Sequence, residues 1–138
     1  MPIVYSSFEK QVIDGLTAAF PELSQGLQSL VQRFVDLEKI IKLVNHPKFK
    51  GRTSIKVALP TLVPDLSYDH LPIANGDDAM VTFAYMAQGY FPPDIVKEKK
   101  EAMLEYCKLD TYAMVKLHQA LDALSGRNNS GNILARMD

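Results

Sequence analysis

The sequence predicts a helix-dominated α/β fold with one or two short strands and about five helices. Three observations lead to this prediction: apolar residues make up 47% of the 138 residues, most of them recur at helical spacing, and strand-like segments are few. This apolar content suits one compact domain with a buried core. We expect the domain to cover residues 1–124, followed by a flexible tail, residues 125–138, that is rich in Gly, Asn and Ser.

The first third of the chain alternates short strand-like and helical segments. Ile3, Val4 and Tyr5 run together and predict a short buried strand. A helix is expected from near Phe8 until Pro21 stops it, and a second helix follows. The residues 34–37 are either a short strand or a helix end, and residues 38–44 are helical again.

The remaining elements are separated by proline-rich loops. A short helix is expected around residues 54–59. Asn75-Gly76 is a turn signal, after which Asp77 or Asp78 caps a helix that runs to about residue 90. Beyond Pro92-Pro93, a long helical pattern runs from about residue 94 to residue 124.

Charge and cysteine content limit the kinds of partner and the cellular compartment that we expect for this protein. The net charge of −1 gives the whole molecule no strong attraction for nucleic acid, so any such binding has to be local. A lone cysteine, Cys107, rules out an internal disulfide and fits a reducing cytoplasm. Because the sequence has no membrane-length apolar run and no signal-peptide pattern, we expect a soluble cytoplasmic protein without a membrane partner.

One local run of positive charge stands out. Between residues 39 and 64 there is no acidic residue, and the candidates for contact with nucleic acid in this run are Lys48, Phe49, Lys50, Arg52, Ser54 and Lys56. The cations could follow a phosphate backbone while the aromatic ring stacks on a base. A solvated basic loop explains the same run equally well.

A carboxylate interrupts the apolar stripe of the last predicted helix. The stripe has spacings of four and three and consists of Met103, Cys107, Asp110, Met114, Leu117, Leu121 and Leu124. A buried, unpaired charge is costly, so Asp110 needs a partner. Two other interpretations remain open: Asp110 caps a fresh helix at Thr111, or it lies at the solvated edge of the stripe. Cys107 is interpreted as a small core residue.

Tyr106 and Asp110 form a Y-x-x-x-D string on this helix. The string resembles the third motif of the DEDDy 3′–5′ exonucleases, which have a ribonuclease-H-like fold. Val4-Tyr5-Ser6-Ser7-Phe8-Glu9 is similar to the second motif, in which a strand and a polar turn precede an acidic residue that opens a helix. Val35-Asp36-Leu37 looks like the strand that follows two helices later. The resemblance implies the C-terminal portion of a ribonuclease-H-like fold.

The run from residue 2 to residue 124 also resembles an uncharacterised bacterial domain family whose members look like ribonuclease-H-like nucleases. The segments that carry this likeness are Phe8-Glu9-Lys10, Val35-Asp36-Leu37, His46-Pro47, Gly51, Ser54-Ile55-Lys56, Leu59-Pro60, Leu66-Ser67-Tyr68 and the stretch from Tyr106 to Met114.

The resemblance implies metal-dependent hydrolysis of phosphodiester bonds in DNA or RNA. Glu9 and Asp110 would bind Mg²⁺ or Mn²⁺, which prefer carboxylate oxygens, and Tyr106 would orient the attacking water. The second motif departs from the wider superfamily, which mostly has Asp at the position of Glu9. Asp36-Leu37-Glu38 also reads D-x-E, but helix-like sequence follows it, so we interpret it as the later strand.

The first D-x-E motif of these exonucleases is expected in a missing N-terminal region of the same protein. This chain would then be inactive or weak alone, and its exposed sheet edge could support a homodimer. Two alternatives to a nuclease stay open. One is a non-catalytic interaction or structural module that kept the fold, and the other is a regulatory fragment that binds nucleic acid without cutting it.

Overall fold

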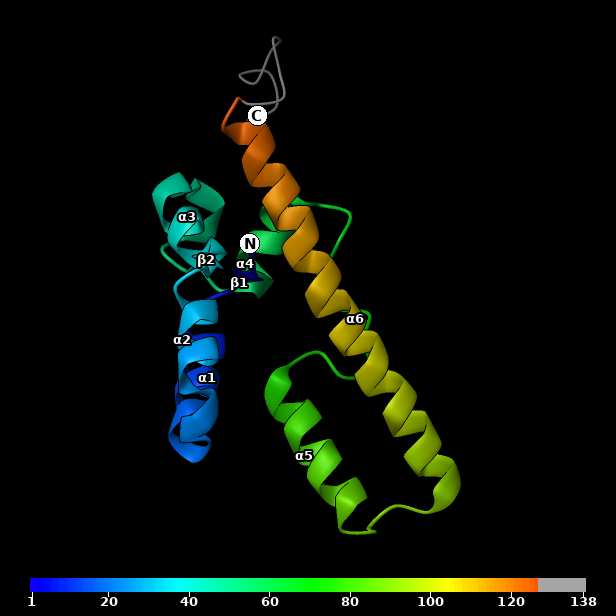
Figure 1. Cartoon of the computed structure of the whole chain (residues 1–138). Helices are drawn as coiled ribbons and strands as arrows, with labels where there is room; N and C mark the ends of the chain where they lie inside the picture. Colours follow the sequence, from blue (N-terminus) through cyan, green and yellow to red (C-terminus); the bar gives the residue numbers. More distant parts are fainter. Residues whose placement is uncertain (127–138) are drawn as a thin grey trace.

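The structure, a computed structural model, describes residues 1–126, and helices dominate it as predicted (Figure 1). Within these residues six α-helices, two short 3-10 helices and a two-stranded sheet form two arms that meet at a small core. The predicted flexible tail lies outside the described residues from residue 127 onward.

The sheet is small and parallel. Strand β1 (Ile3–Val4) pairs with strand β2 (Val35–Asp36), so the ambiguous segment around residue 35 is a strand and not a helix end. Ile3 lies opposite Val35 in this pairing. Parallel neighbours need a crossover connection, and here it is helical. Dimerisation across this sheet stays a prediction.

The crossover forms the first arm. It consists of α1 (Phe8–Ala19), the 3-10 helix η1 (Pro21–Leu23) and α2 (Ser24–Val31), and α1 packs against α2 as a hairpin. Neither helix contains a buried residue. Several apolar side chains along the arm are at least 40% exposed, namely Phe8, Val12, Leu16, Phe20 and Leu23. This arm therefore presents an apolar face that the described residues leave uncovered.

The core lies where the middle of the chain meets the C-terminal helix. Helix α3 (Leu37–Val44) leads into the 3-10 helix η2 (Pro47–Phe49) and helix α4 (Ile55–Leu62), and both α3 and α4 pack against the last helix. The buried core cluster consists of Leu37, Ile41, Phe49, Ala58, Leu59, Tyr68, Ala113, Leu117 and Leu121. Burial of these side chains stabilises the junction of the two arms.

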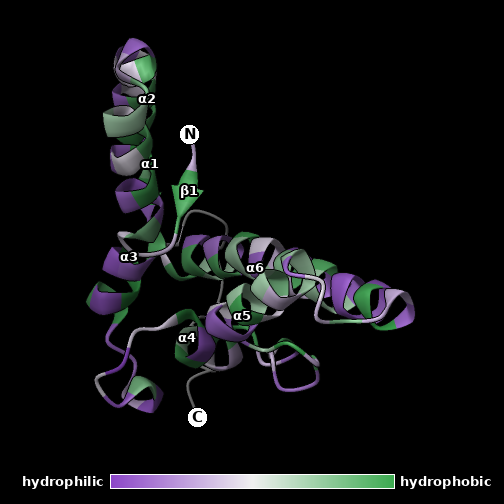
Figure 2. Cartoon of the chain, turned by 90° about the horizontal axis from the view of Figure 1, so that it is seen from below, coloured by the Kyte–Doolittle hydropathy of each residue, from purple (hydrophilic) through white to green (hydrophobic). Residues whose placement is uncertain are grey.

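Helix α5 (Gly76–Ala87) and the first half of α6 (Pro93–Leu124) form the second arm. The two arms diverge from the core when the molecule is seen from below (Figure 2). Asn75, and not Asp77 or Asp78, caps α5, because its side-chain oxygen accepts a hydrogen bond of 2.8 Å from the Asp78 amide. An Asn directly before the first turn satisfies an amide that the helix itself leaves free.

The buried face of α6 is narrower than the predicted stripe. Ala113, Leu117 and Leu121 are buried, whereas Cys107 is exposed and Leu124 is 42% exposed. The interpretation of Cys107 as a core residue is therefore wrong. A straight α-helix drifts by about 20° per heptad from a strict four-and-three repeat, so one repeat cannot face a small core along the whole helix. None of the described helices has the length and apolarity needed to cross a lipid bilayer.

Candidate functional site

Three carboxylates and two tyrosines line one cavity of about 380 Å³ at the junction of the two arms. They come from the end of β1, the first turns of α1 and α3, and the middle of α6. The lining residues are Tyr5, Ser6, Phe8, Glu9, Glu38, Ser54, Ile55, Tyr106, Asp110 and Met114. The structure thus brings together the three residues that the exonuclease resemblance singles out: Glu9, Tyr106 and Asp110.

Glu9 enters the cavity from the first turn of α1. Its Oε1 atom accepts a hydrogen bond of 3.5 Å from the Tyr5 amide, which lies just before the helix. Its Oε2 atom is buried and has no hydrogen-bond partner within residues 1–126. Because a buried carboxylate oxygen without a partner is costly, this atom is the position where the cavity most needs a cation or a donor.

Asp110 has a protein partner. Helix α6 is continuous from Pro93 to Leu124, so the alternative in which Asp110 caps a new helix does not hold. Its Oδ1 atom accepts a hydrogen bond of 2.7 Å from the Tyr68 hydroxyl. Tyr68 is only 4% exposed, so the bond satisfies a buried hydroxyl and a half-buried carboxylate together.

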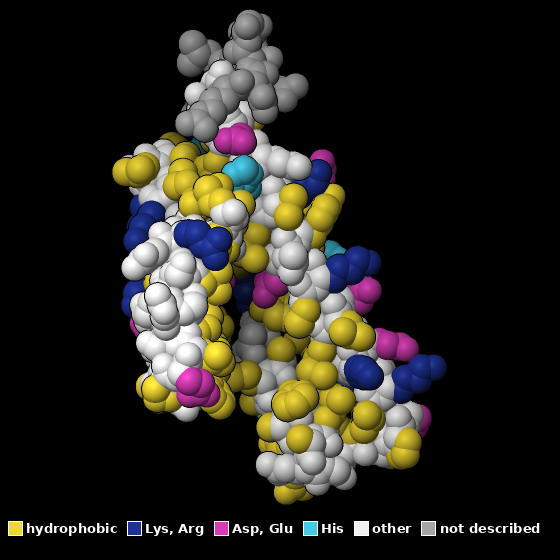
Figure 3. All heavy atoms as spheres, viewed as in Figure 1, with side chains coloured by type: hydrophobic (Ala, Val, Ile, Leu, Met, Phe, Trp, Pro, Cys, Tyr) yellow, Lys and Arg dark blue, Asp and Glu magenta, His cyan; other side chains and the backbone are white. Residues whose placement is uncertain are grey.

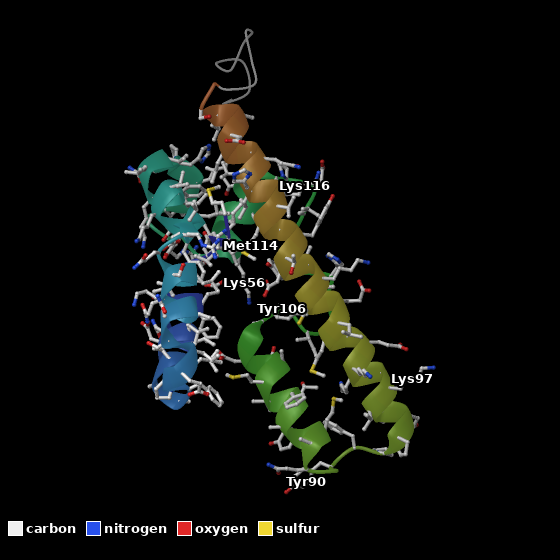
Figure 4. The ribbon with its side chains drawn as sticks, in the orientation of Figure 1. Lys56, Tyr90, Lys97, Tyr106, Met114 and Lys116 are labelled. Atoms are coloured by element: carbon white, nitrogen blue, oxygen red, sulfur yellow. The ribbon has the colours of Figure 1, made fainter. Side chains whose placement is uncertain are left out.

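Tyr106 lies one helical turn before Asp110 on the same side of α6. Tyr106 and Met114 face the gap between the arms, Lys56 enters that space from α4, and Lys97 points away (Figure 4). The rings of Tyr106 and Tyr68 are tilted against each other with centroids 6.1 Å apart. Burial and the nearby Asp110 carboxylate raise the pKa of Tyr106 to about 12. Tyr106 therefore remains protonated at neutral pH, able to orient a ligand but not to act as a base.

Asp36, at the end of β2, and Glu38, in the first turn of α3, already have partners. Asp36 Oδ1 accepts hydrogen bonds from the Ser6 amide at 3.0 Å and from the Glu38 amide at 2.9 Å, and so caps α3 while tying β2 to the turn after β1. Glu38 accepts a bond of 2.8 Å from the Thr53 hydroxyl and lies 3.2 Å from the Lys42 amine. This D-x-E string thus has a local structural role.

Several residues of the site, among them Tyr5, Glu38 and Tyr68, were not predicted as site residues from the sequence. Glu38 lines the cavity because β2 lies beside β1, and only the strand pairing could have revealed this. Tyr68 lies in the loop between α4 and α5, and no spacing connects it with Asp110. Glu38 belongs to the D-x-E string and Tyr68 to the segment Leu66-Ser67-Tyr68 that resembles the uncharacterised family. Neither residue was assigned a role in the site.

The carboxylates of Glu9 and Asp110 could supply part of the ligands of a divalent cation. Within the described residues, no three Asp, Glu, His or Cys side chains are close enough together to hold a metal ion. Mg²⁺ is commonly bound through one or two protein carboxylates, with water and substrate phosphate as the other ligands. Glu9, with its unpartnered oxygen, and Asp110 match that minimal set.

The C-terminal end of the basic segment reaches this cavity. Lys48, Lys50, Arg52, Ser54 and Lys56 are all exposed, and Ser54 lines the cavity itself. Phe49, in contrast, is 1% exposed and belongs to the core cluster. Its ring therefore packs inside the protein and is not available to stack on a base, so we remove it from the predicted interface.

A larger apolar groove, of about 890 Å³, adjoins the cavity. Phe8, Tyr106 and Asp110 line both hollows, and the groove continues along α5 past Met80 and Phe83. Figure 3 shows hydrophobic side chains on the facing sides of the two arms, with an open gap between them. Asp110 and Tyr106 thus lie where the apolar groove meets the cavity.

The tyrosines around the cavity predict a loss of stability at alkaline pH. Burial is the first cause that raises the pKa of Tyr5, Tyr68 and Tyr106, and nearby carboxylates add to it. The unfolded chain ionises its tyrosines near pH 10. Their contribution to stability is therefore complete below about pH 10 and is lost as the pH rises toward the folded pKa values.

We expect the urea midpoint to fall between about pH 9 and about pH 11.5. Tyr68→Phe should reduce this fall, because the buried hydroxyl that resists ionisation is gone. An equally steep fall in Tyr68→Phe and wild type would argue against the role of this tyrosine. Tyr90→Phe, at an exposed position after α5, is the matched control.

A comparison with protein families matches the first part of the chain. Residues 1–54 are similar to a family described as "Domain of unknown function (DUF2779)". The expected likeness to an uncharacterised domain family is confirmed over this segment, which contains Glu9 but not Tyr106 or Asp110. No curated protein and no solved structure matches the chain. The relation to ribonuclease-H-like nucleases stays a prediction.

Proposed function

We propose that this chain contributes Glu9, Asp110 and Tyr106 to a metal-dependent site that hydrolyses phosphodiester bonds in DNA or RNA. The observation that carries the proposal is the buried, unpartnered Oε2 atom of Glu9 in a cavity that Asp110 and Tyr106 also line. These residues come from opposite ends of the sequence. The large majority of buried polar side-chain atoms in folded proteins have a hydrogen-bond partner, so this oxygen favours a ligand in the cavity.

The order of the elements supports a ribonuclease-H-like origin. A strand leads through a polar turn into the helix that carries Glu9, and a helical crossover returns to a parallel strand. The long helix α6 then brings Asp110 to the cavity that Glu9 also lines. This arrangement agrees with the motif order of the exonucleases that the sequence resembles.

Each residue has a defined task in the proposed site. Glu9 and Asp110 bind the divalent cation through carboxylate oxygens. When bound, such a cation activates water and offsets the charge that develops on the phosphate. Tyr106 stays protonated, so it donates a hydrogen bond that orients the attacking water or a phosphate oxygen. Two carboxylates are fewer than a two-metal site uses, so further acidic residues would complete it.

The basic segment supplies the attraction for nucleic acid in this proposal. Lys48, Lys50 and Arg52 are exposed between α3 and α4, and Lys56 faces the space beside Tyr106 (Figure 4). In this proposal these cations hold the phosphate backbone while one phosphate reaches the metal. Because the net charge of the whole chain is only −1, this local cluster would supply most of the attraction for nucleic acid.

The proposal predicts that the chain binds Mn²⁺ through Glu9. Glu9→Gln keeps the size of the side chain and its bond to the Tyr5 amide but removes the charge, so we expect Mn²⁺ affinity to fall at least about tenfold. The measurement is titration of the 138-residue chain with Mn²⁺, with free ion followed by electron paramagnetic resonance. Glu22→Gln, an exposed acidic residue in η1, is the matched control and should bind like wild type.

The same titration can contradict the proposal. If wild-type protein binds no Mn²⁺, or if Glu9→Gln and Glu22→Gln bind it equally well, the carboxylate cavity is not a metal site. That result would favour the second candidate function, a non-catalytic interaction module. The uncovered apolar residues of α1 and α5, such as Phe8 and Met80, favour that candidate.

A further inference from the structure

Asp110 receives its hydrogen bond from outside the motif residues. The donor, Tyr68, comes from the loop between α4 and α5, and its hydroxyl lies 2.7 Å from Asp110 Oδ1. Glu9, the other proposed ligand, has one oxygen without any partner in the described residues. The two carboxylates are thus held differently, and only Asp110 has its orientation set by a side chain.

Tyr68 is well suited to hold a carboxylate in one orientation. Its side chain is 4% exposed and belongs to the core cluster, so the ring cannot move without disturbing the packing. The Leu71 amide donates to the Tyr68 carbonyl at 3.0 Å, which closes a turn around the residue. A hydroxyl on such a fixed ring offers its hydrogen from one direction only.

The geometry points to Tyr68 as a positioning residue for metal binding: its O–H fixes Asp110 Oδ1, so that the other oxygen of the carboxylate is held ready for the cation. This inference rests on the proposed function and adds a residue to it. A carboxylate can rotate about its Cβ–Cγ bond, and a bond of 2.7 Å to one oxygen restricts that rotation. Outer hydrogen-bond partners of this kind orient metal ligands and raise metal affinity.

A purely structural role would leave a different signature. If the bond only satisfies the buried Tyr68 hydroxyl, removing that hydroxyl changes stability but not the affinity of the folded protein for metal. A positioning role changes metal affinity even when the fraction of folded protein is unchanged. Mn²⁺ affinity and stability therefore have to be measured on the same samples.

The test compares Tyr68→Phe with Tyr112→Phe in the full 138-residue chain. Tyr68→Phe keeps the buried ring and removes only the donor, and we expect Mn²⁺ affinity about tenfold weaker than wild type. Tyr112 is 46% exposed on α6, beside Lys116, and its variant should bind Mn²⁺ like wild type. If Tyr68→Phe lowers the folded fraction, the titrations are run in sucrose, which favours the folded state.

Two failures can be told apart. If wild type binds Mn²⁺ in a Glu9-dependent way while folded Tyr68→Phe binds it equally tightly, the positioning role is overturned and the proposed metal site remains. If wild type binds no Mn²⁺, the proposed function and the positioning role both fail. A tenfold loss in Tyr68→Phe with no loss in Tyr112→Phe is the supporting result.

Discussion

Phe49→Ala is expected to lower the free energy of unfolding by about 3–5 kcal/mol, the largest single effect on stability that the structure predicts. The side chain is 1% exposed and is the largest of the fully buried ones. Truncation removes its buried apolar surface and leaves a cavity between the core residues of α3, α4 and α6. Small domains are stable by only about 5–15 kcal/mol, so a large share of the stability would be lost.

Chemical denaturation of wild type and variant in urea measures this loss. Leu43→Ala is the control, because Leu43 lies in neighbouring α3 but is 84% exposed, and its truncation should cost less than about 0.5 kcal/mol. A Phe49→Ala variant as stable as wild type that binds nucleic acid more weakly would return Phe49 to the surface interface. The pair of variants therefore tests both the contribution of Phe49 to the core and its exclusion from the nucleic-acid interface.

Asp110→Asn is expected to reduce metal-dependent degradation of single-stranded nucleic acid by on the order of 100-fold, provided that the protein assayed carries all the acidic residues of the site. The amide keeps an oxygen that can accept the Tyr68 hydrogen bond, so the fold should be retained. What disappears is the negative charge that attracts the cation. The assay follows a labelled oligonucleotide with Mn²⁺ present, and circular dichroism monitors the fold.

Asp122→Asn is the matched control for this experiment. It changes the same functional group on the same helix, more than three turns beyond Asp110 and away from the cavity lining. It should leave degradation unchanged. Full activity in Asp110→Asn would remove Asp110 from the catalytic machinery and leave the nuclease proposal without its second ligand. Equal losses in both variants would point to a general effect of charge on α6.

Much of the helical architecture follows from local patterns. The proline at position 21, the Pro92-Pro93 pair and the apolar spacing of the last helix predict α1 and α6 closely. The strand β2 was ambiguous, because a two-residue strand has no periodicity and exists only through its pairing with β1. The cap of α5 was predicted two or three residues too late, because Asn75 and the two aspartates after it all suit that role.

The site was predictable where spacing along one helix determines it. Tyr106 and Asp110 share a side of α6 because they are four residues apart. The assignment of Phe49 was wrong because neighbouring lysines suggested a surface, although η2 turns that one ring inward. Tyr68 could not be connected with Asp110, because a loop of irregular structure brings them together and no repeat along the chain records it.

Burial along α6 is uneven, and this affects which part of the fold can open locally. All of the buried side chains of this helix lie from Ala113 onward, while its first turns run beside α5, which has none. Backbone amides in such thinly packed segments exchange their hydrogens through local opening, at a free energy well below that of global unfolding. Separation of α5 from the start of α6 would widen the apolar groove beside Tyr106 while Leu117 and its neighbours stay packed. Access to the carboxylates can therefore fluctuate without loss of the fold.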